Sequence, residues 1–429
     1  GKPKKHKVIS RRQSYHGNTL GALASGGNIW RRNFFEDLLI ETSLISPCYT
    51  YRNKRSDETE WDYGQRVAKE LEDEILNLGP DNVMAFIAET VVGATAGALT
   101  AVPGYFKLIR EICNKYDVLL ILDEVMCGMG RTGSLFACDD EPVIPDIITI
   151  AKGLGAGYQP IGAMICQNHI YEAIESGSGF FQHGHTYLGH PVACAASYAV
   201  LSKLINDNYP SKVREKGNIL QESLTKSLGQ NQYIGDIRGR GLFRAIELVA
   251  DRSTKEPFPK KLNVAGKIKK KALDEGLICY PMQGTIDGEN GDHILVAPPF
   301  IINQTEIDEI SEKLKTTIDS VCKFWFDNFM YLRIITIKCP NQTAKKALKL
   351  LNKQVANEQM KVGLVKQTTV DISDTNFLAV KYWISKSHFE KGRKNWIKVS
   401  QEFNEMGAIV SGVGGEADIN MLDDFKNHI

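Results

Sequence analysis

Three charged residues lie at the ends of apolar segments, where charged side chains are unusual. Glu89 ends the segment 83–89, Asp123 follows the apolar residues 118–122, and Lys152 follows the segment 147–151. A buried carboxylate is costly unless a cation or a protonated nitrogen pairs with it. A lysine in a partly apolar pocket has a lowered pKa and can form a Schiff base with a carbonyl compound. These residue types are suited to carbonyl and amine chemistry.

Each residue taken alone also has an ordinary structural explanation. An isolated Asp123 more often caps the next segment or pairs with an arginine such as Arg131. An isolated lysine before glycines is more often solvated or a phosphate anchor, and the G-x-G-x-G that follows Lys152 lacks the spacing of a dinucleotide-binding turn. It is the presence of Asp123 and Lys152 on successive strands that favours chemistry.

Two further segments could hold a flat, phosphorylated ligand. Tyr15 precedes His16 and Gly17, so its ring could stack on a cofactor, although a single tyrosine is more often part of a core. Thr186 precedes a predicted helix at 191–200 that is rich in small residues, and a helix start can bind phosphate.

The elements that would position these residues alternate between strands and helices up to about residue 205. Strands are predicted at 83–89, 118–125, 147–151 and 162–167, and helices at 63–78 and 103–116. This alternation predicts an α/β fold with a mainly parallel sheet, in which ligands bind beyond the carboxyl ends of the strands.

The pattern changes twice further along the chain, which predicts three domains. Residues 1–205 would form a large domain and residues 206–324 a smaller α/β domain. Residues 325–429 have the predicted order strand, helix, strand, strand, helix, strand, which indicates an extra α+β ferredoxin-like (βαββαβ) domain. No motif in this last region assigns it a role.

The composition excludes several classes of function. The 52 basic and 51 acidic residues nearly cancel, which argues against nucleic-acid or membrane partners, and the apolar runs are too short to span a bilayer. The nine cysteines form no C-x-x-C pair, and the histidines at 183, 185 and 190 have no carboxylate or cysteine at ligand spacing. We therefore predict reduced thiols and no metal site.

Four ordered motifs together resemble the class III (omega) aminotransferases, fold type I enzymes that use pyridoxal 5′-phosphate. The motifs are YHGNTLGAL (15–23), LILDEVMCGMGRTG (120–133), IAKGLGAGYQPIGA (150–163) and HGHTYLGHPVACAA (183–196). The resemblance extends from residue 1 to about residue 324. It implies a transaminase, at least a homodimer, that moves an amino group from an amine or omega-amino acid to a 2-oxo acid.

The resemblance also implies roles for the individual residues. Lys152 would bind the cofactor as a Schiff base and then move a proton, and Asp123 would pair with the pyridinium nitrogen. Tyr15 would stack on one ring face and Val125 on the other, with His16 and Gly17 beside Tyr15 in the cofactor site. Glu89 would support the site through hydrogen bonds, and Thr186 would reach the phosphate in the neighbouring subunit.

The substrate is less well specified. Arg240 and Arg244 are candidates for binding a substrate carboxylate, but each is as readily a surface or salt-bridged arginine. Family members that use glutamate often carry an acidic gate where this chain has Ala94, and tend to have Gln where it has Met126. Both differences favour pyruvate as the acceptor. An aminomutase of the same family and a catalytically impaired, truncated scaffold remain alternatives.

In the family, a Gly-Ser-rich turn upstream of the YHG motif cradles the cofactor phosphate. This sequence begins at Gly1, after that position, so we expect the natural N-terminus to lie upstream and this chain to bind cofactor weakly. We expect a cytoplasmic location and leave a mitochondrial one open, because a targeting segment would precede Gly1.

Overall fold

The computed structural model describes residues 2–141, 143–383 and 386–418, and the chain divides into two compact units, Gly1–Ile318 and Asp319–Ile429. The boundary lies within helix α10 (Gln304–Asn328). The separation of the first unit into a large and a small domain stays a prediction. No helix in the described part of the chain is both long and apolar enough to cross a membrane.

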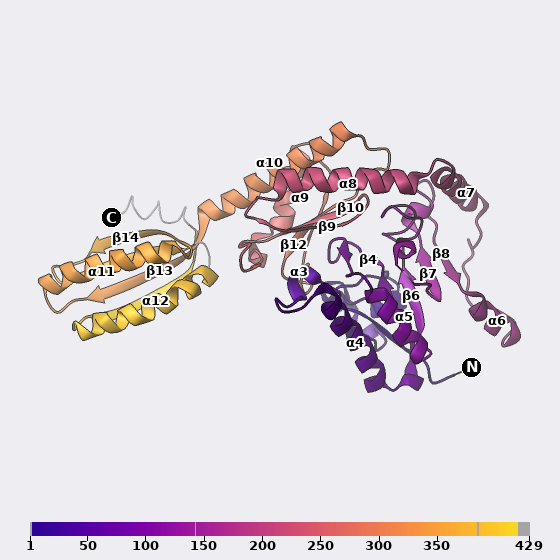
Figure 1. Cartoon of the computed structure of the whole chain (residues 1–429), viewed down its shortest axis with the longest axis horizontal. Helices are drawn as coiled ribbons and strands as arrows, with labels where there is room; N and C mark the ends of the chain where they lie inside the picture. The colour runs from indigo at the N-terminus through magenta and orange to yellow at the C-terminus, as the bar shows by residue number, and fades with distance from the viewer. Residues whose placement is uncertain (1, 142, 384–385, 419–429) are drawn as a thin grey trace. The chain divides into compact units, whose positions relative to one another are not determined.

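A six-stranded sheet forms the centre of the first unit, and its strand order is β2-β1-β3-β6-β7-β8. Strands β6, β7 and β8 of this sheet are labelled in Figure 1. Five strands run parallel: β1 (Lys7–Arg11), β2 (Ser43–Ile45), β3 (Val83–Glu89), β6 (Leu119–Asp123) and β7 (Ile147–Ile150). Strand β8 (Ala163–Cys166) is antiparallel to β7. The predicted α/β architecture with a mainly parallel sheet is confirmed.

Helices α4 (Glu60–Leu78) and α5 (Tyr105–Lys115) contribute to the core around this sheet. Helix α4 begins at a capping box made by Thr59 and Asp62. Its buried face recurs at four-residue steps and shares one core with Phe86 of β3 and Leu122 of β6. The residues of that face are Tyr63, Val67, Leu71 and Ile75. These helices therefore pack against the strands that carry Glu89 and Asp123.

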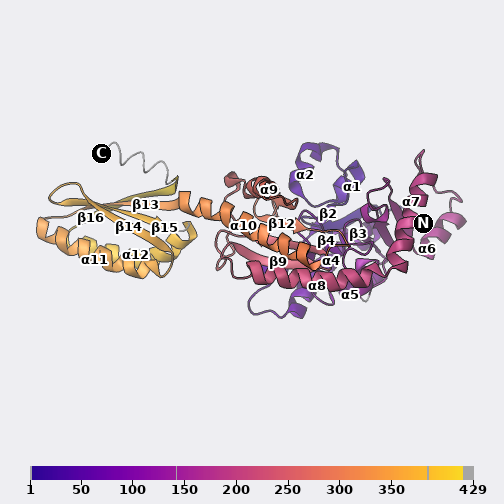
Figure 2. The ribbon, with the colours of Figure 1, turned by 90° about the horizontal axis from the view of Figure 1, so that it is seen from above.

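A second, antiparallel sheet has the order β11-β12-β10-β9. Its strands are β9 (Ile234–Arg240), β10 (Phe243–Leu248), β11 (Tyr280–Gln283) and β12 (Asp292–Val296). Helix α8 (Tyr209–Leu228) lies along β9 (Figure 2). The sequence pattern indicates one strand at 239–249, whereas the structure has a hairpin that reverses at Gly241, whose φ of +51° suits glycine.

The remaining α-helices and β-strands of the first unit are five short segments and three longer helices that follow the large sheet in the chain. They are α1 (Leu20–Ser25), α2 (Ile29–Arg32), α3 (Thr50–Asn53), β4 (Val91–Val92), β5 (Leu99–Thr100), α6 (Asn168–Ser176), α7 (Pro191–Asn206) and α9 (Val264–Asp274). Strands β4 and β5 pair with each other.

The second unit contains a four-stranded antiparallel sheet with the order β14-β15-β13-β16. Its elements are β13 (Phe329–Lys338), α11 (Gln342–Met360), β14 (Leu364–Asp371), β15 (Asn376–Trp383), α12 (Lys386–Glu405) and β16 (Ile409–Asp418). Figure 2 shows both helices on one side of the sheet. Alternate residues of β15, from Phe377 to Trp383, are buried.

Candidate active site

The ends of three neighbouring strands bring the predicted reactive residues to one edge of the large sheet. Glu89 and Asp123 are directly paired in the register of β3 and β6, and Asp123 is paired with Thr149 of β7. Lys152 lies two residues beyond the end of β7. Because carboxyl ends of parallel strands share an edge, this is where the fold is expected to place a ligand.

A cavity of about 500 Å³ opens at this edge. Its wall contains every predicted cofactor-binding residue except Thr186. The lining residues are Tyr15, His16, Gly17, Arg31, Glu89, Val91, Gly93, Ala94, Thr95, Asp123, Val125, Met126, Lys152, Tyr280 and Leu295.

Asp123 is buried and already oriented by two hydrogen bonds. The backbone N–H of Val125 donates to Asp123 Oδ1 over 3.0 Å. His16 Nδ1 lies 2.9 Å from Asp123 Oδ2, and His16 Nε2 is buried with no hydrogen-bond partner among the described residues. Asp123 can therefore present its carboxylate to the cavity in one fixed orientation.

Glu89 holds the turn that carries the tyrosine. Its Oε1 accepts a hydrogen bond from the backbone N–H of Tyr15 over 2.9 Å. Its other carboxylate oxygen lies 3.3 Å from Arg11 Nη2, which also donates to the Glu89 carbonyl. Both side chains are buried, so this ion pair fixes the position of the Tyr15 backbone.

Lys152 begins a single 3₁₀ turn and has a φ of +43°. The residue as a whole is exposed, yet partial desolvation of its ammonium group lowers its pKa. The nearby Asp123 carboxylate opposes this change and the Arg31 guanidinium adds to it. A lowered pKa increases the fraction of neutral amine, which is the nucleophilic form.

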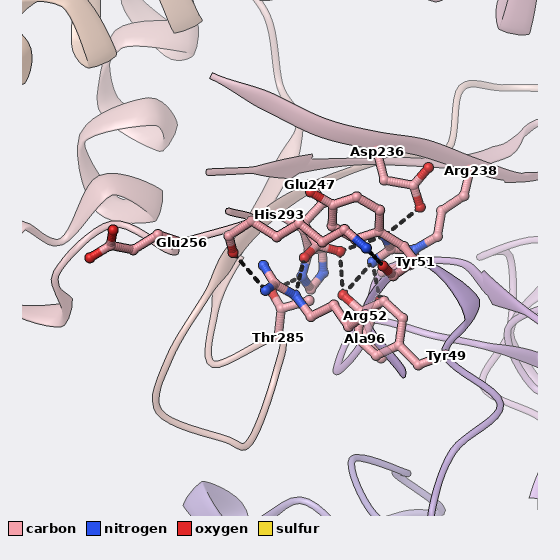
Figure 3. Close-up of polar contacts among 12 residues, drawn as sticks. Tyr49, Tyr51, Arg52, Ala96, Asp236, Arg238, Glu247, Glu256, Thr285 and His293 are labelled. Atoms are coloured by element: carbon pink, nitrogen blue, oxygen red, sulfur yellow. Dashed lines mark hydrogen bonds and ion pairs between the residues drawn. The ribbon is translucent and has the colours of Figure 1, made fainter. Parts of the chain in front are cut away.

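The loop Gly93–Gly97 forms another part of the cavity wall and is held by a buried polar network (Figure 3). Arg238 donates to the carbonyls of Ala96 and Gly97, over 2.7 and 2.8 Å. The same guanidinium is 2.6 Å from Glu247 Oε2. The small sheet is thereby connected to the loop.

Glu247 is the centre of this network. Arg52 Nε lies 2.6 Å from Glu247 Oε1, and the Tyr49 hydroxyl also donates to the carboxylate. Burial favours the neutral carboxyl, yet Arg238 and Arg52 hold the pKa of Glu247 below its usual range. The side chain is fully buried and charged, so its two arginines are required to keep it there.

His293 of β12 also lies against this loop. Its Nδ1 is 2.7 Å from the Thr285 hydroxyl, and burial lowers the pKa of the imidazole to about 3. Gly97 has a φ of +65°, and a Cβ at that position would be 2.6 Å from the His293 ring. The neutral imidazole and the glycine allow the loop to pass close to β12.

The two arginines predicted to bind substrate do not line the cavity. Arg240 donates to the Ala137 carbonyl and forms an ion pair with Glu141. Arg244 is buried and donates to several backbone carbonyls and to Gln221, and burial lowers its pKa to about 10. Neither guanidinium is brought to the predicted cofactor residues.

Thr186 lies on an exposed turn before α7 and is not part of the cavity. Ala94 and Met126, the two positions singled out for specificity, both line it. The sequence pattern missed Arg31, which also lines the cavity. The available signal was the run Asn28-Ile29-Trp30-Arg31, since an asparagine before a short helix suggests a cap that fixes the arginine.

The cavity residues fit pyridoxal phosphate at its ring and aldehyde. Asp123 provides a fixed carboxylate for a protonated ring nitrogen, Lys152 provides an amine for an aldehyde, and Tyr15 with Val125 provides surfaces for a flat ring. These are the chemical groups by which proteins hold this cofactor.

Comparison with known proteins identifies the family to which the chain belongs. Residues 1–318 match the family model of class III aminotransferases. The chain is 46% identical over 321 residues to an uncharacterized aminotransferase of Schizosaccharomyces pombe, covering 75% of this chain and 70% of the relative. It is 36% identical over 329 residues to the diaminobutyrate–2-oxoglutarate transaminase of Halomonas elongata, covering 75% and 68%.

A solved omega transaminase from Pseudomonas jessenii, in complex with PMP, has a similar structure. The TM-score is 0.70 at 32% identity, and the match covers 75% of this chain and 70% of that one. From the family-model match, the sequence identity to these relatives and the similar fold, we conclude that the chain belongs to the class III aminotransferases, a family of enzymes that depend on pyridoxal phosphate.

Proposed function

We propose that this chain is a transaminase that moves an amino group from an omega-amino acid or amine to a 2-oxo acid, with pyruvate favoured. The observation that carries the proposal is the convergence of Lys152 and Asp123 on one cavity that Tyr15 and Val125 also line. No ion pair joins Asp123 to Lys152 among the described residues. A single ligand that binds both side chains explains why both lie at this cavity.

Pyridoxal phosphate, when bound, supplies an aldehyde that reacts with amines and a ring that accepts electrons from the substrate carbon. Asp123 would hold the proton on the ring nitrogen, and His16 would keep Asp123 in place. Tyr15 and Val125 would orient the ring. Lys152 would bind the aldehyde through Nζ and, once released by the substrate, would use the same atom to move a proton at the substrate carbon.

The acceptor preference rests on two cavity residues. Ala94 and Met126 leave the wall without an acidic group or an amide at these positions. The Halomonas relative is named for 2-oxoglutarate, so the two acceptors must be compared directly. We expect pyruvate to regenerate the aldehyde form of the protein faster, measured as single-turnover absorbance; a strong preference for 2-oxoglutarate would contradict the assignment.

A homodimer is part of the proposal. Thr186 lies within an exposed region that also carries several exposed apolar side chains, and large apolar patches of this kind usually mark an interface. The apolar side chains are Phe180, Phe181, Tyr187, Leu188 and Tyr198. Sedimentation equilibrium should give a dimer mass, and Tyr187→Asp should shift it towards the monomer, whereas Tyr171→Asp on the exposed face of α6 should not.

The activity is tested with added pyridoxal phosphate and a panel of amine donors. Transamination predicts that a 2-oxo acid is consumed and an amino acid appears in equal amounts. An aminomutase would instead move the amino group within one substrate and consume no 2-oxo acid. A scaffold would show neither reaction in the wild-type chain.

We also infer that residues 325–429 form a ferredoxin-like domain, which their element order and antiparallel strand order support.

A further inference from the structure

The carboxylates of the cavity already have partners within the chain. Glu89 accepts hydrogen bonds from the Tyr15 backbone and from Arg11. Asp123 is bonded to His16 and to the Val125 backbone. A cation in the cavity wall that is not among these partners can bind an anion supplied by a ligand.

Arg31 is such a cation. It lies on α2 (Ile29–Arg32), which Asn28 caps by accepting a hydrogen bond from the Arg31 N–H. Asn28 is buried and in turn donates to Gln13 over 2.7 Å, so the start of the helix is fixed. The position of Arg31 is thus set by its backbone and does not depend on its charge having a partner.

The Arg31 guanidinium lies against two aromatic rings. It lies 4.5 Å from the centre of the Tyr15 ring and 5.6 Å from that of Trp30. Its Nε is buried without a hydrogen-bond partner, and no ion pair involves this side chain within the described part of the chain. A guanidinium stacked on an aromatic ring keeps its in-plane N–H groups available, which is the geometry that binds a carboxylate with two parallel hydrogen bonds.

The other arginines near the site differ from Arg31 in this respect. Arg238 is bonded to two carboxylates and two carbonyls, and Arg240 pairs with Glu141. Their hydrogen-bonding capacity is used to join the small sheet to the rest of the unit. Arg31 is the guanidinium that lines the cavity, and it lines it together with Lys152.

We propose that Arg31 binds the carboxylate of the substrate: the distal carboxylate of an omega-amino acid in one half-reaction and the carboxylate of the 2-oxo acid in the other. The inference rests on the proposed transaminase function and assigns its substrates to carboxylate-bearing compounds. Lys152 then acts at the amine-bearing carbon while Arg31 holds the opposite end. The same positive charge lowers the pKa of Lys152, so a bound carboxylate would partly restore it.

The test compares 3-aminopropionate with propylamine, which lacks the carboxylate, in the full chain loaded with pyridoxal phosphate. Arg31→Gln should raise KM for 3-aminopropionate about 10- to 100-fold, since a charge-assisted bidentate contact is lost. KM for propylamine should change less than about twofold, and Arg31→Lys should recover part of the loss. Arg12→Gln, which alters an exposed arginine outside the cavity, is the control.

A second measurement does not depend on activity. Propionate binding to the cofactor-free chain, followed by calorimetry, should be detectable in the wild type and in Arg12→Gln and lost in Arg31→Gln. If the wild type binds propionate through Arg31 but transaminates neither donor, the proposed function fails and the carboxylate site stands. If propionate binding is the same in all three proteins, the inference is wrong.

The cofactor phosphate is the other anion that Arg31 could bind. The affinity of the chain for pyridoxal phosphate distinguishes a phosphate-binding role of Arg31 from a carboxylate-binding role. Titration of the chain with pyridoxal phosphate, followed by visible absorbance, should give the same Kd for the wild type and Arg31→Gln. A Kd raised tenfold or more in Arg31→Gln, with both donors affected equally, would assign Arg31 to the phosphate and overturn the proposal.

Discussion

The network around Glu247 and the cavity at the strand ends are both built from charged residues, but they differ in whether their cations have carboxylate partners. Glu247 receives hydrogen bonds from Arg52, Arg238 and Tyr49 (Figure 3). In the cavity, Lys152 and the Arg31 side chain have no ion pair among the described residues. Partnered charges join segments of the chain, whereas unpartnered charges are available to a ligand. Substitutions in the network should therefore affect folding, and substitutions in the cavity should affect chemistry.

The largest expected effect is on catalysis. Lys152→Ala should reduce transamination roughly 10⁴-fold, the upper range for a positioned acid–base group. The free energy of unfolding should stay within about 0.5 kcal/mol of the wild type, because Lys152 is exposed. Steady-state rates and urea denaturation give the two values, and Lys203→Ala, at an exposed lysine paired with Asp207, is the matched control. Retained activity in Lys152→Ala would remove the basis of the proposed function.

The next effect is on stability. Glu247→Ala leaves Arg52 and Arg238 without the buried carboxylate and should lower the free energy of unfolding by about 3–5 kcal/mol. Urea denaturation measures this change, and Asp73→Ala, which removes an exposed carboxylate paired with Lys69, should cost less than about 1 kcal/mol. Equal losses in the two variants would show that the buried network around Glu247 stabilises the fold no more than an exposed ion pair does.

A third effect depends on pH. The pKa of His293 is about 3 in the folded chain and 6.5 for an ordinary histidine, so below pH 6.5 the unfolded chain binds a proton that the folded chain does not. The folded chain pays no penalty from His293 above pH 6.5, and the penalty grows as the pH falls towards 3. At pH 5 it should lower the free energy of unfolding by about 2 kcal/mol. His293→Gln should unfold with a shallower dependence between pH 7 and 5, while His169→Gln, at an exposed histidine, should follow the wild type.

The smallest effect tests a cavity residue that has a partner. The Thr95 hydroxyl donates to the Gln13 carbonyl and is buried, although Thr95 lines the cavity. Thr95→Val should lower the free energy of unfolding by about 1 kcal/mol. The cofactor Kd should not change, and Thr100→Val, with a longer hydrogen bond of 3.4 Å, should cost less. A large rise in the cofactor Kd without loss of stability would contradict the rule that a partnered side chain affects folding and not ligand binding.

The sequence predicted the parts of the site that depend on neighbouring strands. Glu89, Asp123 and Lys152 follow apolar segments whose lengths and order determine a parallel sheet, so their meeting at one edge could be expected. Arg238 could not be placed in this way, because its partner Ala96 lies far away in the chain and the contact depends on how the small sheet packs. Arg31 was missed because a four-residue helix has no periodic pattern. Arg240 and Arg244 were selected by residue type, which cannot reveal that their hydrogen bonds are already made.

The backbone of Lys152 has an evolutionary consequence. Its φ of +43° is a left-handed conformation that costs a residue with a side chain roughly 1 kcal/mol and costs glycine little. Lys152→Gly should therefore fold at least as stably as the parent. In a lineage under selection for folding alone, this position would drift towards glycine or asparagine. We therefore expect lysine at this position in relatives that catalyse the reaction, and glycine or asparagine in descendants that keep only the fold.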